Sequence, residues 1–122
     1  MNAFEVGKKL VELCKQGKNQ EAVETLYSPD IVSVEAGAPP GMQRETRGFE
    51  GVAGKGKWWA ENHIIHSHEV DGPWPHDNRF IVRFKYDITN KPSGRRMQLD
   101  EAGLYTVEDG KIVREEFFYS MG

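Results

Sequence analysis

The hydrophobic positions at the start of the chain recur every three or four residues, which is the spacing of one face of a helix. Asn2 and Glu5 have the spacing of a capping box at the start of this helix, and Gly17 marks its end. Two further helices are predicted, one from Asn19 up to the stop at Pro29 and one over residues 49–62. The stripe that defines the first helix consists of Val6, Leu10, Leu13 and Cys14.

Alternation of apolar and polar positions replaces the helical spacing from Ile64 onward, and this pattern predicts strands. Residues 90–94 and 108–110 have the composition of hairpin turns. One earlier strand, residues 31–35, precedes a loop rich in glycine and proline at residues 37–48. Helices first and strands afterwards indicate an α+β fold with the helices on one face of an antiparallel sheet. The later strands are predicted at residues 64–70, 80–88, 96–107 and 112–119.

Length and composition narrow the class of protein. The chain has 122 residues and a net charge of −3, and we expect one domain over residues 1–122. Basic and acidic residues are mixed along the chain, so no nucleic-acid partner is expected. The single cysteine excludes an internal disulfide. We see no signal peptide and no apolar run of membrane-spanning length, and therefore expect a soluble cytoplasmic protein without a membrane partner.

Three segments carry a resemblance to a known family. They are Asn-Gln-Glu-Ala-Val-Glu-Thr-Leu-Tyr-Ser-Pro-Asp-Ile-Val-Ser-Val-Glu at residues 19–35, Gly-Phe-Glu-Gly-Val at residues 48–52, and Asp-Gly-Lys-Ile at residues 109–112 before an aromatic-rich last strand. In this order the chain resembles the nuclear transport factor 2-like superfamily, and within it the SnoaL-like proteins and ketosteroid isomerases. The resemblance implies a cone-shaped curved antiparallel sheet packed over three N-terminal helices, enclosing a pocket. It also implies a homodimer formed through the open face of the sheet.

Strand alternation divides the side chains between the two faces of the sheet. The face of strand 80–88 that carries Phe84 is apolar and is expected to point at the helices. Both faces of the last two strands carry apolar residues, so periodicity alone leaves their inward face open, and such a sheet suits a dimer. Similarity to ketosteroid isomerases favours an inward orientation for Asp100, Ala102, Leu104, Phe117 and Tyr119, together with His66, His68 and Trp74.

Glu35 closes the first predicted strand, at a position that resembles that of the general base in ketosteroid isomerases. A carboxylate in the wall of an apolar pocket shuttles protons readily. The alternative is an exposed glutamate at a strand end. His66 and His68 are two residues apart on a strand, so both are expected to point the same way. They are interpreted as a proton partner for Glu35, as a metal-binding pair, or as polar residues of the pocket wall.

Asp100 is a candidate second carboxylate, because two acids in different environments divide into acid and base roles. The competing interpretation is a structural ion pair with Arg83 or Arg114 across the sheet. Large apolar side chains are expected to form walls for a flat or cyclic ligand. The predicted ligand-binding residues are Trp59, Trp74, Phe84, Leu104, Phe117 and Tyr119.

The chain also departs from the ketosteroid isomerases. Leu10 and Val11 stand in the neighbourhood where those enzymes carry a helix tyrosine, and Ala102 stands where they carry a protonated aspartate. Loss of such oxyanion donors costs several kcal/mol in comparable sites, so steroid isomerisation is not expected.

Three hypotheses of function follow. The first is a cofactor-free enzyme that performs acid–base chemistry (isomerase, cyclase, dehydratase or hydrolase type) on a small apolar or aromatic carbonyl compound. Its catalytic residues are Glu35, His66, His68 and Asp100. The second is a ligand-binding or dimeric interaction module of the same fold without catalysis. No metal is assigned in either, whereas the third hypothesis is a metal-dependent protein that uses the His66 and His68 pair.

Overall fold

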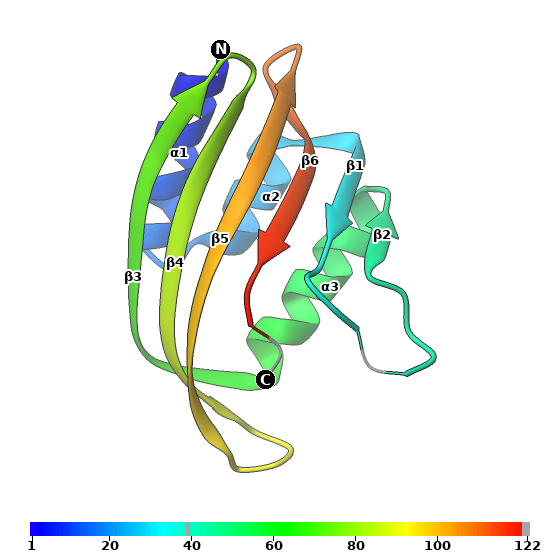
Figure 1. Cartoon of the computed structure of the whole chain (residues 1–122), viewed down its shortest axis with the longest axis vertical. Coiled ribbons are helices and arrows are strands. Elements are labelled where there is room, and N and C mark those ends of the chain that lie inside the picture. Colours follow the sequence, from blue (N-terminus) through cyan, green and yellow to red (C-terminus); the bar gives the residue numbers. More distant parts are fainter. Residues whose placement is uncertain (39, 121–122) are drawn as a thin grey trace.

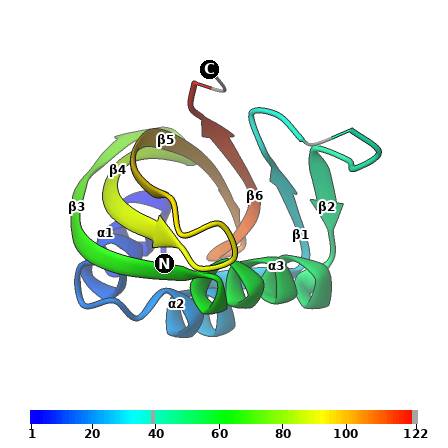
Figure 2. The same cartoon turned by 90° about the horizontal axis from the view of Figure 1, so that it is seen from below.

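Three helices pack against one curved sheet of six strands in the computed structural model, which describes residues 1–38 and 40–120 (Figures 1 and 2). The helices are α1 (Ala3–Lys15), α2 (Asn19–Leu26) and α3 (Phe49–Glu61). The strands are β1 (Tyr27–Val34), β2 (Glu45–Arg47), β3 (His63–His76), β4 (Arg79–Asn90), β5 (Arg96–Glu108) and β6 (Lys111–Phe118). None of the three helices in these residues is long and apolar enough to span a bilayer.

The order of strands across the sheet is β2-β1-β6-β5-β4-β3. All neighbours are antiparallel except β1 and β6, which run parallel, so the sheet is mixed. The prediction of an α+β fold with three helices on a curved sheet is confirmed, with this one parallel pair as the difference. The short strand β2 lies inside the predicted loop 37–48 and pairs with β1 over three residues, too few to show an alternating pattern.

Local signals account for the ends of α1. The Asn2 side chain accepts from the backbone of Glu5, and the Glu5 side chain accepts from the backbone of Asn2, which confirms the capping box. The first turn after the helix passes through Gly17, whose φ of +74° lies in the left-handed region that glycine tolerates. The apolar stripe of α1 is buried as predicted, and Val6 and Leu10 are almost completely covered.

The core lies between the helices and the concave face of the sheet. Alternation in β4 buries Phe80, Val82, Phe84, Tyr86 and Ile88, as predicted, and exposes the residues between them or leaves them half-buried. The sheet curls over the helices like an open cone (Figure 2). A backbone hydrogen bond from Lys91 to the carbonyl of Asn62 ties the β4–β5 hairpin to the end of α3.

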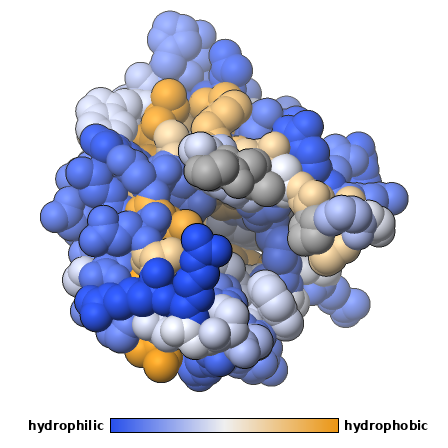
Figure 3. Space-filling model, turned by 60° about the horizontal axis from the view of Figure 1, so that its bottom comes forward, coloured by the Kyte–Doolittle hydropathy of each residue, from blue (hydrophilic) through white to orange (hydrophobic). Residues whose placement is uncertain are grey.

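Seen from the side of the β4–β5 hairpin, the surface is hollowed between this hairpin and the β1–β2 segment (Figure 3). Two hollows lie elsewhere in the described residues, along α1 and β3. They have volumes of about 290 and 220 Å³ and are shallow. The enclosed pocket inferred from the resemblance therefore stays a prediction.

Candidate functional site

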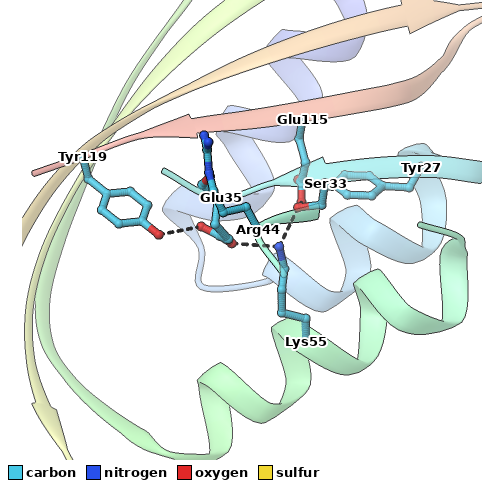
Figure 4. A network of polar contacts seen from close by, with 7 residues as sticks. All are labelled: Tyr27, Ser33, Glu35, Arg44, Lys55, Glu115 and Tyr119. Carbon is cyan, nitrogen blue, oxygen red and sulfur yellow. Dashed lines mark hydrogen bonds and ion pairs between the residues drawn. The ribbon is translucent and has the colours of Figure 1, made fainter. Parts of the chain in front are cut away.

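A network of polar side chains crosses the concave face near the open end of the cone (Figure 4). Glu35, directly after β1, forms an ion pair with Lys55 of α3, with 2.7 Å between Oε1 and Nζ. The hydroxyl of Tyr119, directly after β6, donates to the other oxygen of Glu35 at 3.0 Å. Burial, followed by the Glu35 carboxylate, raises the pKa of Tyr119 to about 12, so this hydroxyl keeps its proton. Glu35 is therefore held from two sides by groups on different elements.

The same network of hydrogen bonds continues into the core. Lys55 also donates to the hydroxyl of Ser33 at 2.6 Å, and Ser33 donates to Glu115 of β6 at 2.6 Å. The second oxygen of Glu115 accepts from the hydroxyl of Tyr27. Burial raises the pKa of Glu115, and the hydrogen bonds from Ser33 and Tyr27 partly offset this effect. A carboxyl group is thus accommodated deep between β1 and β6 because both of its oxygens have donors.

Glu101 of β5 is a third carboxyl group of this region. Burial, and then the nearby carboxylates of Glu35 and Glu115, raise the pKa of Glu101 to about 7, against a smaller opposing effect of Lys55. At neutral pH this side chain is therefore divided between its protonated and ionised forms. Such a group both donates and accepts protons at physiological pH.

Glu101, Gly103 and Tyr105 follow one another along the inward face of β5. A Cβ at Gly103 would come within 2.8 Å of the Tyr105 ring and 3.1 Å of its hydroxyl, so the ring occupies the space that glycine leaves. The ring therefore leans along the strand toward Glu101. It stacks on Phe80 with 5.0 Å between ring centroids and is almost completely buried. Burial raises the pKa of Tyr105 well above its ordinary value, which keeps the hydroxyl as a donor.

Aromatic side chains surround these polar groups. Trp59 of α3 stacks on His63 at 4.6 Å between centroids and lies 5.5 Å from Tyr86. The Phe117 ring lies edge-on to Tyr105 and 5.9 Å from the ammonium group of Lys55. The site therefore combines carboxyl groups with an apolar, aromatic lining, which suits proton transfer to a small apolar compound.

The structure brings some of the predicted residues into this region and turns others away. Glu35, Trp59, Phe84, Phe117 and Tyr119 are on the concave side, as predicted. The predicted inward orientation of Asp100, Ala102 and Leu104 is wrong, because β5 buries Gly103, Tyr105 and Val107 instead. Asp100 forms a two-pronged ion pair with Arg83 on the outer face, which confirms the competing structural interpretation.

The predicted inward orientation of Trp74 is also wrong. It pairs in register with Ile81, an outward residue of β4, and both side chains are about half exposed. A register shift between Asp71 and Trp74 interrupts the alternation that the prediction assumed.

His66 and His68 do not point the same way, because a bulge between Ile65 and Ser67 inserts one residue into β3. His66 contacts the hydroxyl of Thr89 at 2.7 Å on the outer face. His68 lies beside Tyr86 and contacts the carbonyl of Lys15 at 3.2 Å. The two rings therefore do not converge on one point. In residues 1–38 and 40–120, no three His, Cys, Asp or Glu side chains cluster as a metal site.

Sequence reasoning missed Lys55, Ser33 and Glu101 as site residues. Lys55 lies in a helix with three glycines and a weak apolar stripe, so helical periodicity does not predict which way its side chain points. In β5 the residues that face inward are more apolar than those that face outward, and this difference could have identified the inward face. The inward residues are Met97, Leu99, Glu101, Gly103, Tyr105 and Val107.

This cone of three helices and a curved mixed sheet is the nuclear transport factor 2-like fold. The SnoaL-like domain model matches residues 1–119, and the chain belongs to the SnoaL-like family. A provisionally named SnoaL-like polyketide cyclase from Mesorhizobium loti is 43% identical, with a TM-score of 0.91 over 98% of this chain and 100% of that one.

More distant structures show the same fold. A provisionally named isomerase from Bacillus subtilis has a TM-score of 0.80 at 19% identity, over 98% of this chain and 90% of that one. A ketosteroid isomerase-like protein from Catenulispora acidiphila, solved with trimethylamine, has a TM-score of 0.72 at 18% identity, over 96% and 86% of the two chains. No curated protein matches the sequence.

Proposed function

We propose that this SnoaL-like protein is a cofactor-free enzyme that moves protons on a small apolar or aromatic carbonyl compound. The observation that carries the proposal is a pair of carboxyl groups in one aromatic cone with different environments. Glu35 is ion-paired with Lys55, whereas burial raises the pKa of Glu101 to about 7. When two carboxyl groups lie in environments that favour different protonation states, one acts as the base and the other as the acid.

In this proposal Glu35 is the base and Glu101 the acid. The Glu35 carboxylate takes a proton from the carbon next to the carbonyl group, and protonated Glu101 gives its proton to the carbonyl oxygen, which leaves an enol. The Tyr105 ring, which leans toward Glu101, packs beside this side chain from within the core. The exchange is balanced when Glu35 trades this proton with solvent and returns one to the carbon, while the enol returns its proton to Glu101. Glu101 replaces the two histidines of the sequence-based hypothesis, because those rings lie on opposite faces of β3.

Deuterium exchange tests this function without knowledge of the natural substrate. Cyclic and aromatic ketones are incubated with the protein in D₂O, and loss of the proton next to the carbonyl group is followed by NMR. We expect exchange above the buffer rate for at least one class of ketone, falling as pH rises above about 7 because Glu101 loses its proton. Ketones that bind without any exchange would instead support the non-catalytic ligand-binding module.

We also propose that a second copy of the chain covers the outer face of the sheet. Trp74, Ile81 and Phe118 are exposed by 53%, 43% and 51% on this face, and Leu104 lies beside Ile81 in register. Contiguous exposed apolar side chains mark interaction surfaces. We expect sedimentation equilibrium to give the mass of a dimer, and Ile81→Asp to shift it toward the monomer. A wild-type monomer at every concentration would contradict the proposed dimer.

A further inference from the structure

We propose that Ser33 and Glu115 act together as a positioning pair for the reacting carboxylate. Glu115 fixes the direction of the Ser33 hydroxyl, and Ser33 then holds Lys55 against Glu35 (Figure 4). Neither Ser33 nor Glu115 reaches the substrate in this proposal. The inference rests on the proposed role of Glu35 and extends it to residues deep in the sheet.

The two members of the pair are fixed by the sheet itself. Ser33 of β1 and Glu115 of β6 are register partners in the parallel pairing, so their side chains lie on the same face. Ser33 is completely buried and Glu115 is 4% exposed. Buried polar groups in such a position have few alternative conformations, because each one needs its hydrogen-bond partner.

The direction of the hydrogen bonds follows from the number of protons available. A serine hydroxyl has one proton, and Ser33 gives it to Glu115 at 2.6 Å. Its oxygen is then left as an acceptor, and Lys55 donates to it at 2.6 Å. Lys55 has three donors, and a second one goes to Glu35 at 2.7 Å. The ammonium group is thus held between two acceptors, and the Glu35 carboxylate lies beside a fixed cation.

A Ser–Lys pair at this distance also occurs in nucleophilic catalysis, where lysine takes the proton of serine. The present contacts do not fit that role. Lys55 is ion-paired with Glu35 and acts as the donor, while the proton of Ser33 faces Glu115. Ser33 is also completely buried, so no substrate atom approaches its oxygen. Positioning is the role that the geometry supports.

Among the described residues, six titratable groups interact with the Glu115 carboxyl group. Tyr27 lies on β1, Lys55 on α3, and Glu35 directly after β1. Cys14 of α1 contributes another, and Tyr105 and Glu101 of β5 complete the set. Lys55 is the cation that acts on Glu115 among these groups, and a change at Ser33 is expected to act on Glu35 through Lys55, whereas a change at Glu115 also acts on Glu35 directly by charge.

Ser33→Ala tests the pair, with Ser28→Ala as the matched control on the same strand. Ser28 accepts from the backbone of Asp30 and takes no part in the contacts of Lys55. Glu115→Gln is the second variant, because glutamine keeps the shape of the side chain but has one acceptor for two donors. Thermal unfolding establishes that each variant is folded before comparison.

Two readouts separate positioning from a general loss of structure. In the deuterium-exchange assay, Ser33→Ala is expected to lower kcat roughly ten- to hundredfold with little change in KM. The carboxyl carbon resonance of Glu35, identified by its loss in Glu35→Gln, is expected to shift in Ser33→Ala and in Glu115→Gln. Ser28→Ala is expected to leave both readouts unchanged.

The resonance decides the inference independently of catalysis. If the Glu35 signal of folded Ser33→Ala stays at its wild-type position, the positioning pair is refuted. If the signal moves but wild-type protein exchanges no ketone, the pair positions Glu35 as proposed and the proposed function fails by itself. If kcat falls and the signal moves, both stand.

Discussion

Glu35→Gln is expected to lower the rate of ketone proton exchange by about 10²- to 10⁴-fold. Glutamine keeps the shape of the side chain and an acceptor for Tyr119, which now donates to Glu35 at 3.0 Å. It cannot take a proton from carbon, and it removes the ion pair with Lys55. The measurement is the initial rate of deuterium incorporation, with substrate affinity followed separately by titration.

The control for this substitution is Asp87→Asn, another carboxyl-to-amide change in a strand. Asp87 lies on the outer face, where it forms an ion pair with Arg96 at 2.9 Å. Its replacement is expected to leave the exchange rate at the wild-type level. A Glu35→Gln variant that is folded, binds ketones and exchanges them at the wild-type rate would remove Glu35 from the mechanism.

Glu101→Gln is expected to change how the stability of the protein depends on pH. The pKa of Glu101 is raised from 4.5 to about 7 in the folded protein, so between these values the folded chain keeps a proton that the unfolded chain has lost. The free energy of unfolding therefore falls as pH rises through this window and levels off above it. The contribution of Glu101 to this fall is about 3 kcal/mol, and the glutamine variant lacks it.

Urea unfolding of wild type and variant at pH 5 and pH 8 measures this difference. Glu115, whose pKa is also raised, contributes a slope of the same sign to both proteins, so the difference between the two slopes reports Glu101 together with its interaction with Glu115. Asp100→Asn is the control at the neighbouring, outward position. The Arg83 side chain lowers the pKa of Asp100, so the pH range in which Asp100 changes stability lies below this window. Equal slopes for wild type and Glu101→Gln would show that Glu101 ionises normally in the folded protein.

The sequence was sufficient for the helices, for most strands and for the class of fold, because these depend on local patterns. The capping box at Asn2 and the alternation around Phe84 both appear in the structure as predicted. The parallel pairing of β1 with β6 was out of reach, because it joins strands that are far apart in the chain. Strand β2 was missed because three residues are too few to show an alternation of apolar and polar positions.

The residues of the candidate site were predicted only in part, and the physical reason differs from the one that applies to the strands. Alternation shows that Asp100 and Glu101 face opposite sides, and the resemblance to ketosteroid isomerases favoured the Asp100 side although the Glu101 side is the more apolar one. A single inserted residue in β3 then separated His66 from His68. Glu35 was predicted because it closes the first strand at a position that resembles that of the ketosteroid isomerase base, whereas the contacts of Lys55 depend on how α3 packs on β1.

Titration of the Glu101 side chain in the folded protein tests the central claim most directly. The carboxyl carbon of Glu101 is followed by NMR from pH 4 to pH 9 in glutamate-labelled protein, with Glu101→Gln to assign the signal. Burial beside Glu35 and Glu115 predicts a midpoint near 7. A midpoint near the ordinary value of 4.5 would mean that the cone holds no acid available at neutral pH, and would contradict the division of roles between Glu35 and Glu101.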